Sequence, residues 1–249
     1  MMKKYKKINQ KKLRRHAVIR KLLSIFASTF DKSTSTTARI MHIAVSGNIG
    51  SGKTTLTKML ADHYGWLPRF EPVVENPYLE DYYRDIKRWA FNLEVFFLKE
   101  RFRDTLELLA HPEQTTIQDR TIFEGVHVFV ANNYAKGHFS DDDFATYMEL
   151  FEQMMTFVTY PDLMIYLRAP LEHLVANIQK RGRDYEQTIS LDYLKGLNER
   201  YEDFIYNKYK GKVMVVEVSG MDYKNRPEDF ATITNRIDSM LYGLFPHDN

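Results

Sequence analysis

The stretch GNIGSGKT, Gly47 to Thr54, fills every fixed position of the phosphate-binding pattern G-x-x-x-x-G-K-[S/T]. It directly follows an apolar run at residues 40–45 that is typical of a buried strand, and a helix is expected over residues 52–64. Glycines at this spacing let backbone N–H groups surround phosphate oxygens, while the lysine reaches the β- and γ-phosphates and the helix presents its positive end. The stretch therefore predicts a nucleotide-phosphate site formed by Gly47, Asn48, Ile49, Gly50, Ser51, Gly52, Lys53, Thr54 and Thr55.

Composition indicates one sizeable hydrophobic core, because 44% of the 249 residues are hydrophobic. No apolar run approaches the roughly 18 residues that a membrane-spanning helix requires. The sequence contains no cysteine, which excludes disulfides and thiolate metal sites and fits a reducing compartment. We expect a cytoplasmic protein without a membrane partner.

Charge is distributed unevenly along the chain. Residues 1–40 carry 12 lysines and arginines against the single acid Asp31, and the remaining 209 residues hold 23 basic and 32 acidic groups. An acidic body gives no support for a nucleic-acid partner. We expect residues 1–40 to be a basic, disordered extension and residues 41–249 to be the functional domain. Met41 stands where the first strand begins, which favours an upstream start-site artefact or a dispensable tail, with an organellar transit peptide as the alternative.

Strand-like and helix-like segments alternate after the first strand. Further strands are predicted at residues 67–74, 115–118, 163–167 and 213–218, and further helices at 78–109, 122–134, 142–157, 170–180, 191–206 and 227–242. This order is typical of an α/β fold, a three-layer α/β/α sandwich around a mainly parallel sheet, as in P-loop NTPases. Ligands collect at the carboxyl ends of parallel strands, where this sequence places Asp119 and Arg120.

Several short motifs follow the phosphate-binding stretch in a characteristic order. They are Glu71-Pro72-Val73, Tyr83, Arg88-Trp89, Glu94, Arg101, Asp119-Arg120-Thr121 and the run RGRDYE from Arg181 to Glu186. Together they resemble the deoxynucleoside kinase family, especially its bacterial deoxyadenosine and deoxyguanosine kinases, over essentially all of residues 41–249. The resemblance implies transfer of the γ-phosphoryl group of ATP, with Mg²⁺, to the 5′-hydroxyl of a deoxynucleoside in nucleotide salvage. It also implies a homodimer.

The resemblance assigns the reacting groups. Attack by a sugar hydroxyl is helped by a carboxylate within hydrogen-bond reach, and Glu71 matches the general base of the family. Arg120 is expected to hold Glu71 and the 5′-oxygen in register, and Asp119 to hold Mg²⁺ together with Thr54, directly or through water. The alternatives are a solvated turn carboxylate at Glu71 and an ordinary ion pair at the end of a strand.

Three polar side chains are expected on one face of the helix at residues 78–109. Tyr83, Glu94 and Arg101 are separated by 11 and 7 residues, which is about three and two helical turns. The resemblance gives Tyr83 and Glu186 contacts to the 3′-hydroxyl, Glu94 the base-reading position and Arg101 support for base recognition. The alternative is a solvated helix face.

Two positions depart from the pattern of the family. Many relatives have glutamine at the position of Glu94 and an acidic residue at that of Gly125. Because a carboxylate only accepts hydrogen bonds, we hypothesise that Glu94 accepts from N–H groups of a purine, with guanine the base to test first.

The segment around Gly182 resembles an arginine-bearing lid. Arg181 and Arg183 are expected to close over the triphosphate and neutralise charge on the transferred phosphoryl group. Asn177 replaces an arginine that relatives often have a turn earlier. The alternative is an exposed basic helix end.

Other classes of protein fit less well. A nucleoside monophosphate kinase, thymidylate kinase above all, would need basic groups for the acceptor phosphate, and a GTPase switch would need an Asn-Lys-x-Asp motif that is absent from this sequence. A non-catalytic nucleotide-binding module stays open. The eight histidines show no metal-ligand spacing, and Met148, Met154 and Met155 are expected in the core or in a subunit interface.

Overall fold

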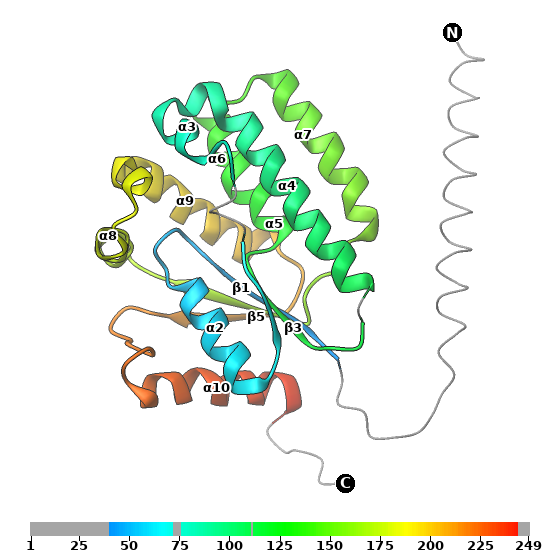
Figure 1. Cartoon of the computed structure of the whole chain (residues 1–249), viewed down its shortest axis with the longest axis vertical. Coiled ribbons are helices and arrows are strands. Elements are labelled where there is room, and N and C mark those ends of the chain that lie inside the picture. Colours follow the sequence, from blue (N-terminus) through cyan, green and yellow to red (C-terminus); the bar gives the residue numbers. More distant parts are fainter. Residues whose placement is uncertain (1–39, 72–75, 111, 244–249) are drawn as a thin grey trace, which may run out of the picture. The chain divides into compact units, whose positions relative to one another are not determined.

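Five parallel strands form the central sheet of the computed structural model, in the order β2-β3-β1-β4-β5 (Figure 1). They are β1 His42–Gly47, β2 Leu67–Arg69, β3 Thr116–Asp119, β4 Leu163–Arg168 and β5 Val213–Glu217. The structure describes residues 40–71, 76–110 and 112–243. Internal contacts divide the chain into Met1–Arg39 and Ile40–Asn249, and every described residue belongs to the second unit. The predicted N-terminal extension therefore lies outside the described residues, apart from its last residue.

Helical segments connect the strands. They are α2 Lys53–Tyr64, α3 Leu79–Arg84, α4 Ile86–Ala110, α5 Ile122–Glu124, the π-helical turn η1 Gly125–Val130, α6 Ala131–Ala135, α7 Asp141–Met154, the 3₁₀ turn η2 Met155–Phe157, α8 Leu171–Arg181, the 3₁₀ turn η3 Asp184–Thr188, α9 Leu191–Asp203, the π-helical turn η4 Phe204–Lys208 and α10 Pro227–Tyr242. None of the helices in the described ranges is both long and apolar enough to cross a membrane.

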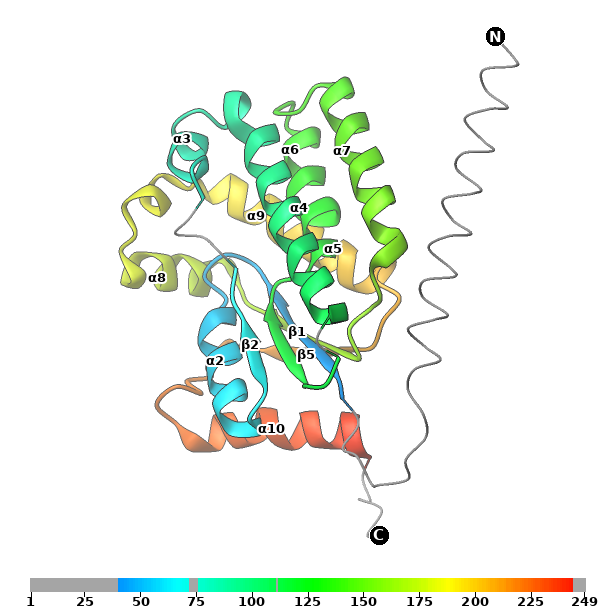
Figure 2. The ribbon, with the colours of Figure 1, turned by 45° about the vertical axis from the view of Figure 1, so that its right-hand side comes forward.

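Side chains on opposite faces of the sheet enter two separate cores. On β4, Leu163 and Ile165 pack into the core beneath α2 and α10, while Met164 and Tyr166 pack into the core shared with α4, α7 and α9. This alternation is the period of a strand that is buried on both faces. Figures 1 and 2 show α2 and α10 on one side of the sheet and α4 to α7 with α9 on the other. The predicted three-layer fold is confirmed.

The single helix predicted at residues 78–109 is wrong, because the chain breaks between α3 and α4. Asp85 leaves helical geometry with φ −144° and ψ 82°, and its side chain accepts a hydrogen bond of 3.1 Å from the backbone N–H of Arg88. This is the N-cap arrangement, in which an aspartate satisfies an orphan N–H at the start of the next helix. Tyr83 therefore lies on α3, and only Glu94 and Arg101 share a helix.

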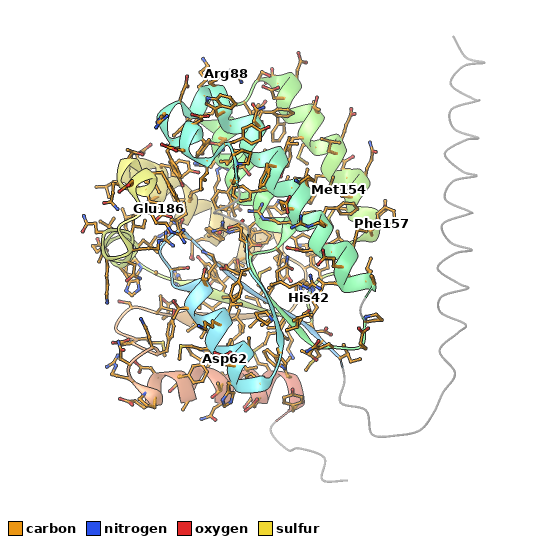
Figure 3. The ribbon with its side chains drawn as sticks, in the orientation of Figure 1. His42, Asp62, Arg88, Met154, Phe157 and Glu186 are labelled. Atoms are coloured by element: carbon orange, nitrogen blue, oxygen red, sulfur yellow. The ribbon has the colours of Figure 1, made fainter. Side chains whose placement is uncertain are left out.

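We expect Asp85→Ala to lower the free energy of unfolding by about 1 kcal/mol, because the N-cap acceptor of α4 is lost. Urea unfolding monitored by circular dichroism measures this. The control is Asp62→Ala, which removes an exposed carboxylate from the last turn of α2, where it is not an N-cap (Figure 3). Equal stability of the Asp85 variant and the control would contradict this account of the break.

The second strand is also shorter than expected. Strand β2 ends at Arg69, two residues before Glu71, and the rest of the strand predicted for residues 67–74 falls partly on residues 72–75, which lie outside the description. Residues 122–134 are helical as predicted, but the middle of the segment is the π-helical turn η1. The other predicted elements agree with the structure apart from shifts at their ends. On α7 and η2, Met148, Met154 and Met155 are partly buried against the core.

Candidate active site

The loop between β1 and α2 wraps into a cradle because its glycines adopt backbone angles that other residues avoid. Gly50 and Gly52 have φ of 83° and 96°. A Cβ at Gly50 would lie 2.6 Å from the carbonyl oxygen of Leu174, and one at Gly52 would lie 2.1 Å from the hydroxyl of Tyr223. Asn48 fastens the loop to α9, since its Nδ2 donates to the Leu194 carbonyl at 3.0 Å. The glycines of the loop thus allow its conformation, and close contacts with neighbouring elements hold the loop in place.

Lys53 and Thr54 open α2 with their polar atoms toward the carboxyl ends of the strands. The Nζ of Lys53 donates to the Asn48 carbonyl at 2.9 Å, and the Oγ1 of Thr54 donates to Oδ2 of Asp119 at 2.5 Å. Burial and then the charge of Arg120 lower the pKa of Lys53 to about 7. A phosphate anion in the cradle would favour the protonated lysine, which suits a phosphate-binding role.

The carboxylate of Asp119 has an oxygen of the kind that binds a hard cation. Its Oδ1 is buried and has no hydrogen-bond partner among the residues described here, whereas Oδ2 is held by Thr54. The described ranges contain no group of three or more histidine or carboxylate side chains that could hold a metal by themselves. Magnesium binds through one or two protein oxygens plus phosphate and water, so Thr54 and Asp119 fit Mg²⁺ only in company with a nucleotide.

Glu71 lies between two buried arginines. Its Oε2 accepts from Nη1 of Arg120 at 2.7 Å, and its Oε1 accepts from Nη2 of Arg101. Burial by itself would raise the pKa of Glu71, but Arg120, Arg101 and Lys53 outweigh it, so the pKa lies below its ordinary value. Glu71 is therefore ionised at neutral pH. The pairing with Arg120 was predicted, and the one with Arg101 was missed.

Arg120 occupies a backbone conformation that non-glycine residues rarely adopt. Its φ is +71°, the only positive value at a non-glycine position in the described chain. The following turn holds it there: Glu124 accepts from the backbone N–H of Thr121 at 2.7 Å, and Oγ1 of Thr121 caps the N–H of Phe123 at 3.3 Å. Such strain is concentrated at functional sites, where surrounding structure enforces it. No feature of the sequence predicted this backbone conformation at Arg120.

Glu94 and Tyr83 reach the same cavity from different helices. Glu94 is 2% exposed, and its Oε1 accepts from Nδ2 of Asn133 at 3.4 Å. Tyr83 stacks on Tyr185, with ring centroids 5.9 Å apart. Burial raises the pKa of Glu94 to about 8 despite the nearby charge of Arg101. Sequence reasoning missed Asn133, which stands beside a second amide, Asn132, on the short helix α6.

The raised pKa of Glu94 predicts how stability depends on pH. The folded protein holds a proton that the unfolded chain releases near pH 4.5, so the contribution of Glu94 is complete below that pH and is lost progressively up to about pH 8. We expect Glu94→Gln to gain stability relative to the native chain, by about 1.4 kcal/mol per pH unit at most, between pH 6 and 8. Urea unfolding at several pH values measures the difference. A difference that does not change with pH would show that Glu94 titrates normally.

Arg181 and Arg183 flank the C-terminus of α8, where Gly182 has φ 65°. Both pair with Glu186: Nε of Arg181 lies 2.9 Å from Oε2, and Nη1 of Arg183 lies 3.3 Å from Oε1. Glu186 is 5% exposed, whereas the two arginine side chains are about one-third exposed. Figure 3 shows Glu186 beside α8, near the cradle. Asn177 donates to the carbonyl of Gly50 at 2.7 Å and so ties α8 to the cradle.

Two cavities meet at the cradle. The first is lined by Glu71, Tyr83, Glu94, Arg101, Asp119, Arg120, Glu186 and by apolar side chains that include Leu79, Leu93, Phe97 and Phe129. The second is lined by Gly52, Thr55, His173, Asn177 and the loop from Met221 to Asn225. Five residues belong to both, namely Gly50, Lys53, Thr54, Arg181 and Arg183. The predicted side chains of the acceptor site thus line the first cavity, and it joins the second at Lys53, Thr54, Arg181 and Arg183.

Comparison with known proteins gives consistent results. A family model described as deoxynucleoside kinase matches residues 43–242. The chain is 35% identical to a deoxyadenosine/deoxycytidine kinase of Bacillus subtilis over 83% of this chain and 94% of that protein. It is 38% identical to a deoxyadenosine kinase of Dictyostelium discoideum, over 84% and 87%. The solved structure of deoxyadenosine kinase from M. mycoides with bound dCTP superposes with a TM-score of 0.70 at 30% identity, covering 80% of this chain and all of that one.

Proposed function

The chain belongs to the deoxynucleoside kinase family, and we propose that it transfers the γ-phosphoryl group of ATP to the 5′-hydroxyl of a purine deoxynucleoside. As a member of this family it is a phosphotransferase that acts on a nucleoside hydroxyl and uses a nucleotide phosphate donor. The proposal rests above all on the two cavities that share Lys53, Thr54, Arg181 and Arg183. A donor in one cavity and an acceptor in the other would meet at these four residues, three of which are cationic.

The cradle and α2 bind the donor in this proposal. Backbone N–H groups of Gly50 to Lys53 surround the phosphates, and Lys53 adds a positive charge that the anion stabilises. Thr54 and Asp119 would hold Mg²⁺, which neutralises charge on the phosphates when it is bound. The second cavity, beside Tyr223, leaves space for the base and ribose of the donor.

Glu71 activates the acceptor hydroxyl. Each carboxylate oxygen has two lone pairs, so the hydrogen bonds from Arg101 and Arg120 leave further acceptor positions free for the 5′-hydroxyl. Because the two arginines keep Glu71 ionised, it can take the proton of the 5′-hydroxyl while the 5′-oxygen bonds to the γ-phosphorus of ATP and the bond from that phosphorus to the β–γ bridging oxygen breaks, which releases ADP. The strained backbone of Arg120 aims its guanidinium at this carboxylate.

Arg181 and Arg183 act as the lid cations. Both already line the acceptor cavity, and their guanidinium groups are paired with Glu186. Charge that spreads over the transferred phosphoryl group would compete with Glu186 for them, and Gly182 gives the segment freedom to adjust. Glu186 would then accept a hydrogen bond from the 3′-hydroxyl. The hydroxyl of Tyr83 would either accept from the same group or donate to it.

We also propose a cytoplasmic homodimer formed through α4 and α7. These helices lie side by side (Figures 1 and 2), and partly buried Phe96, Phe102 and Met148 lie on them together with the exposed Leu106 and Leu109. Such an apolar flank is typical of a subunit interface. Sedimentation equilibrium that returned the mass of one chain would contradict it.

ATP-dependent phosphorylation of the four deoxynucleosides tests the proposed function. ADP formation with deoxyguanosine or deoxyadenosine is expected at a higher kcat/KM than with thymidine, and dTMP and dGMP serve as acceptors that would reveal a monophosphate kinase. Repeating the assay on a chain that begins at Met41 tests the assignment of the domain to residues 41–249. ATP binding without phosphorylation of any deoxynucleoside would overturn the proposal in favour of a non-catalytic nucleotide-binding module.

A further inference from the structure

Arg101 and Glu94, which both line the acceptor cavity, carry buried polar atoms that lack partners among the described residues. Arg101 is 4% exposed, and its Nε and Nη1 have no hydrogen-bond partner within the described part of the chain. The Oε2 of Glu94 is likewise without one. Leaving buried polar atoms unpaired is unfavourable, so a bound base that offered partners to Arg101 and Glu94 would be favoured.

Gly125 explains why Arg101 keeps unused donors. A Cβ at this position would lie 3.0 Å from Nη1 of Arg101 and 3.0 Å from the hydroxyl of Tyr147. A carboxylate there would accept from the guanidinium, whereas glycine supplies no acceptor. The Nη2 of Arg101 donates to Glu71, so its Nε and Nη1 are the groups that an acceptor on the ligand would satisfy.

Asn133 fixes the role of Glu94. The Oδ1 of Asn133 accepts from the hydroxyl of Tyr82 at 3.1 Å and lies 3.3 Å from Nδ1 of His138. Its Nδ2 is therefore the atom that faces Glu94, where it donates to Oε1. The remaining carboxylate oxygen, Oε2, is left to accept from the base.

We propose that the site selects a 6-oxopurine, guanine or hypoxanthine, by pairing a base carbonyl with Arg101 and an adjacent ring N–H with Glu94. This inference rests on the proposed function and defines its substrate class. Adenine has an amino group at C6 and no hydrogen at N1, so its edge would set a donor against the donors of Arg101 and would not supply the N–H that the ionised form of Glu94 requires. A site built to pair polar groups rejects a ligand that leaves them unpaired.

In the free protein Glu94 is mostly protonated at neutral pH, so a base N–H that pairs with Oε2 must displace this proton. Burial raises the pKa of Glu94 to about 8, and an N–H donor against Oε2 would favour the ionised form and lower the pKa again. The charged groups that act on Glu94 are Arg101, Arg120 and Glu71. The hydroxyls of Tyr82, Tyr147 and Tyr193 also lie close enough to interact with Glu94, and burial keeps all three neutral by raising their pKa values.

The test compares kcat/KM for deoxyinosine, deoxyguanosine and deoxyadenosine. Deoxyinosine has the carbonyl and the N–H without the 2-amino group, so it isolates the proposed edge. For the native chain we expect both 6-oxopurines to exceed deoxyadenosine by about tenfold or more, the worth of one buried hydrogen bond to a charged group. No variant is needed for this comparison.

Gly125→Asp and Gly125→Asn form a matched pair of equal size. The aspartate would accept from Arg101 and so occupy the donors proposed for the base carbonyl, and the ratio of deoxyinosine to deoxyadenosine should fall by about tenfold or more relative to the asparagine variant. Thermal unfolding verifies that both variants fold, and Gly125→Ala serves if they do not, with an unchanged ratio expected. Deoxyadenosine turnover equal to or above that of deoxyinosine in the native chain would overturn the inference while kinase activity stands. Absence of phosphorylation for every deoxynucleoside would instead overturn the proposed function.

Discussion

Replacing Glu71 with glutamine is expected to lower kcat for deoxynucleoside phosphorylation by about 10²- to 10⁴-fold, the range for loss of a general base. Glutamine keeps the size of the side chain but cannot take the proton of the 5′-hydroxyl. The KM for ATP should change little, because Glu71 lies in the acceptor cavity and not in the one beside Tyr223. Steady-state kinetics, with single-turnover measurements to isolate the chemical step, provide the readout.

The same substitution has a structural cost that must be measured separately. Glu71 neutralises two arginines that are 4% and 8% exposed, and removing one partner of a buried charge pair costs about 3–5 kcal/mol. Calorimetric unfolding of the variant should show this loss. Activity is therefore compared at a temperature where both proteins are folded.

Glu107→Gln is the matched control. Glu107 accepts from Nη1 of Arg69 at 2.6 Å, but its side chain is 50% exposed, so its removal should cost at most about 1 kcal/mol and leave kcat unchanged. A Glu71→Gln enzyme that keeps kcat within threefold of the native value while losing stability would assign Glu71 a structural role only.

The parts of the site that sequence predicts are those set by short-range patterns. The cradle from Gly47 to Thr54 is contiguous, and its glycines meet local backbone requirements. Asp119 and Arg120 end a buried strand, and the rule for parallel sheets places that end beside the cradle. Neither inference needs knowledge of how distant helices pack.

The relations that sequence did not predict depend on packing across the fold. Arg101 pairs with Glu71, 30 positions away, because α4 packs close to the chain that follows β2. The left-handed backbone of Arg120 is enforced by Thr121 and Glu124. The break at Asp85 was readable, since aspartate is a good N-cap, but helical periodicity on both sides concealed it. Tyr83 nevertheless reaches the cavity because α3 packs back over α4.

Arg181→Ala is expected to lower kcat by about 10³-fold, the lower end of the range for arginines that stabilise a transferred phosphoryl group. The Nε and Nη2 of Arg181 both bind Glu186, so the fork is already oriented at the junction of the two cavities. Arg181→Lys keeps the charge but cannot bind with two parallel N–H groups, and an intermediate loss is expected.

Lys180→Ala is the control that separates this role from general attraction of the triphosphate. Lys180 lines the donor cavity but not the acceptor cavity, so its loss removes one positive charge near the donor and none from the junction. Its expected effect is a modest rise in the KM for ATP with kcat retained. Equal effects of the Lys180 and Arg181 substitutions on both constants would reduce Arg181 to a general electrostatic contributor. A selective loss of kcat in Arg181→Ala would place its guanidinium against charge that develops during transfer, because an interaction made equally in the ground state would change KM alone.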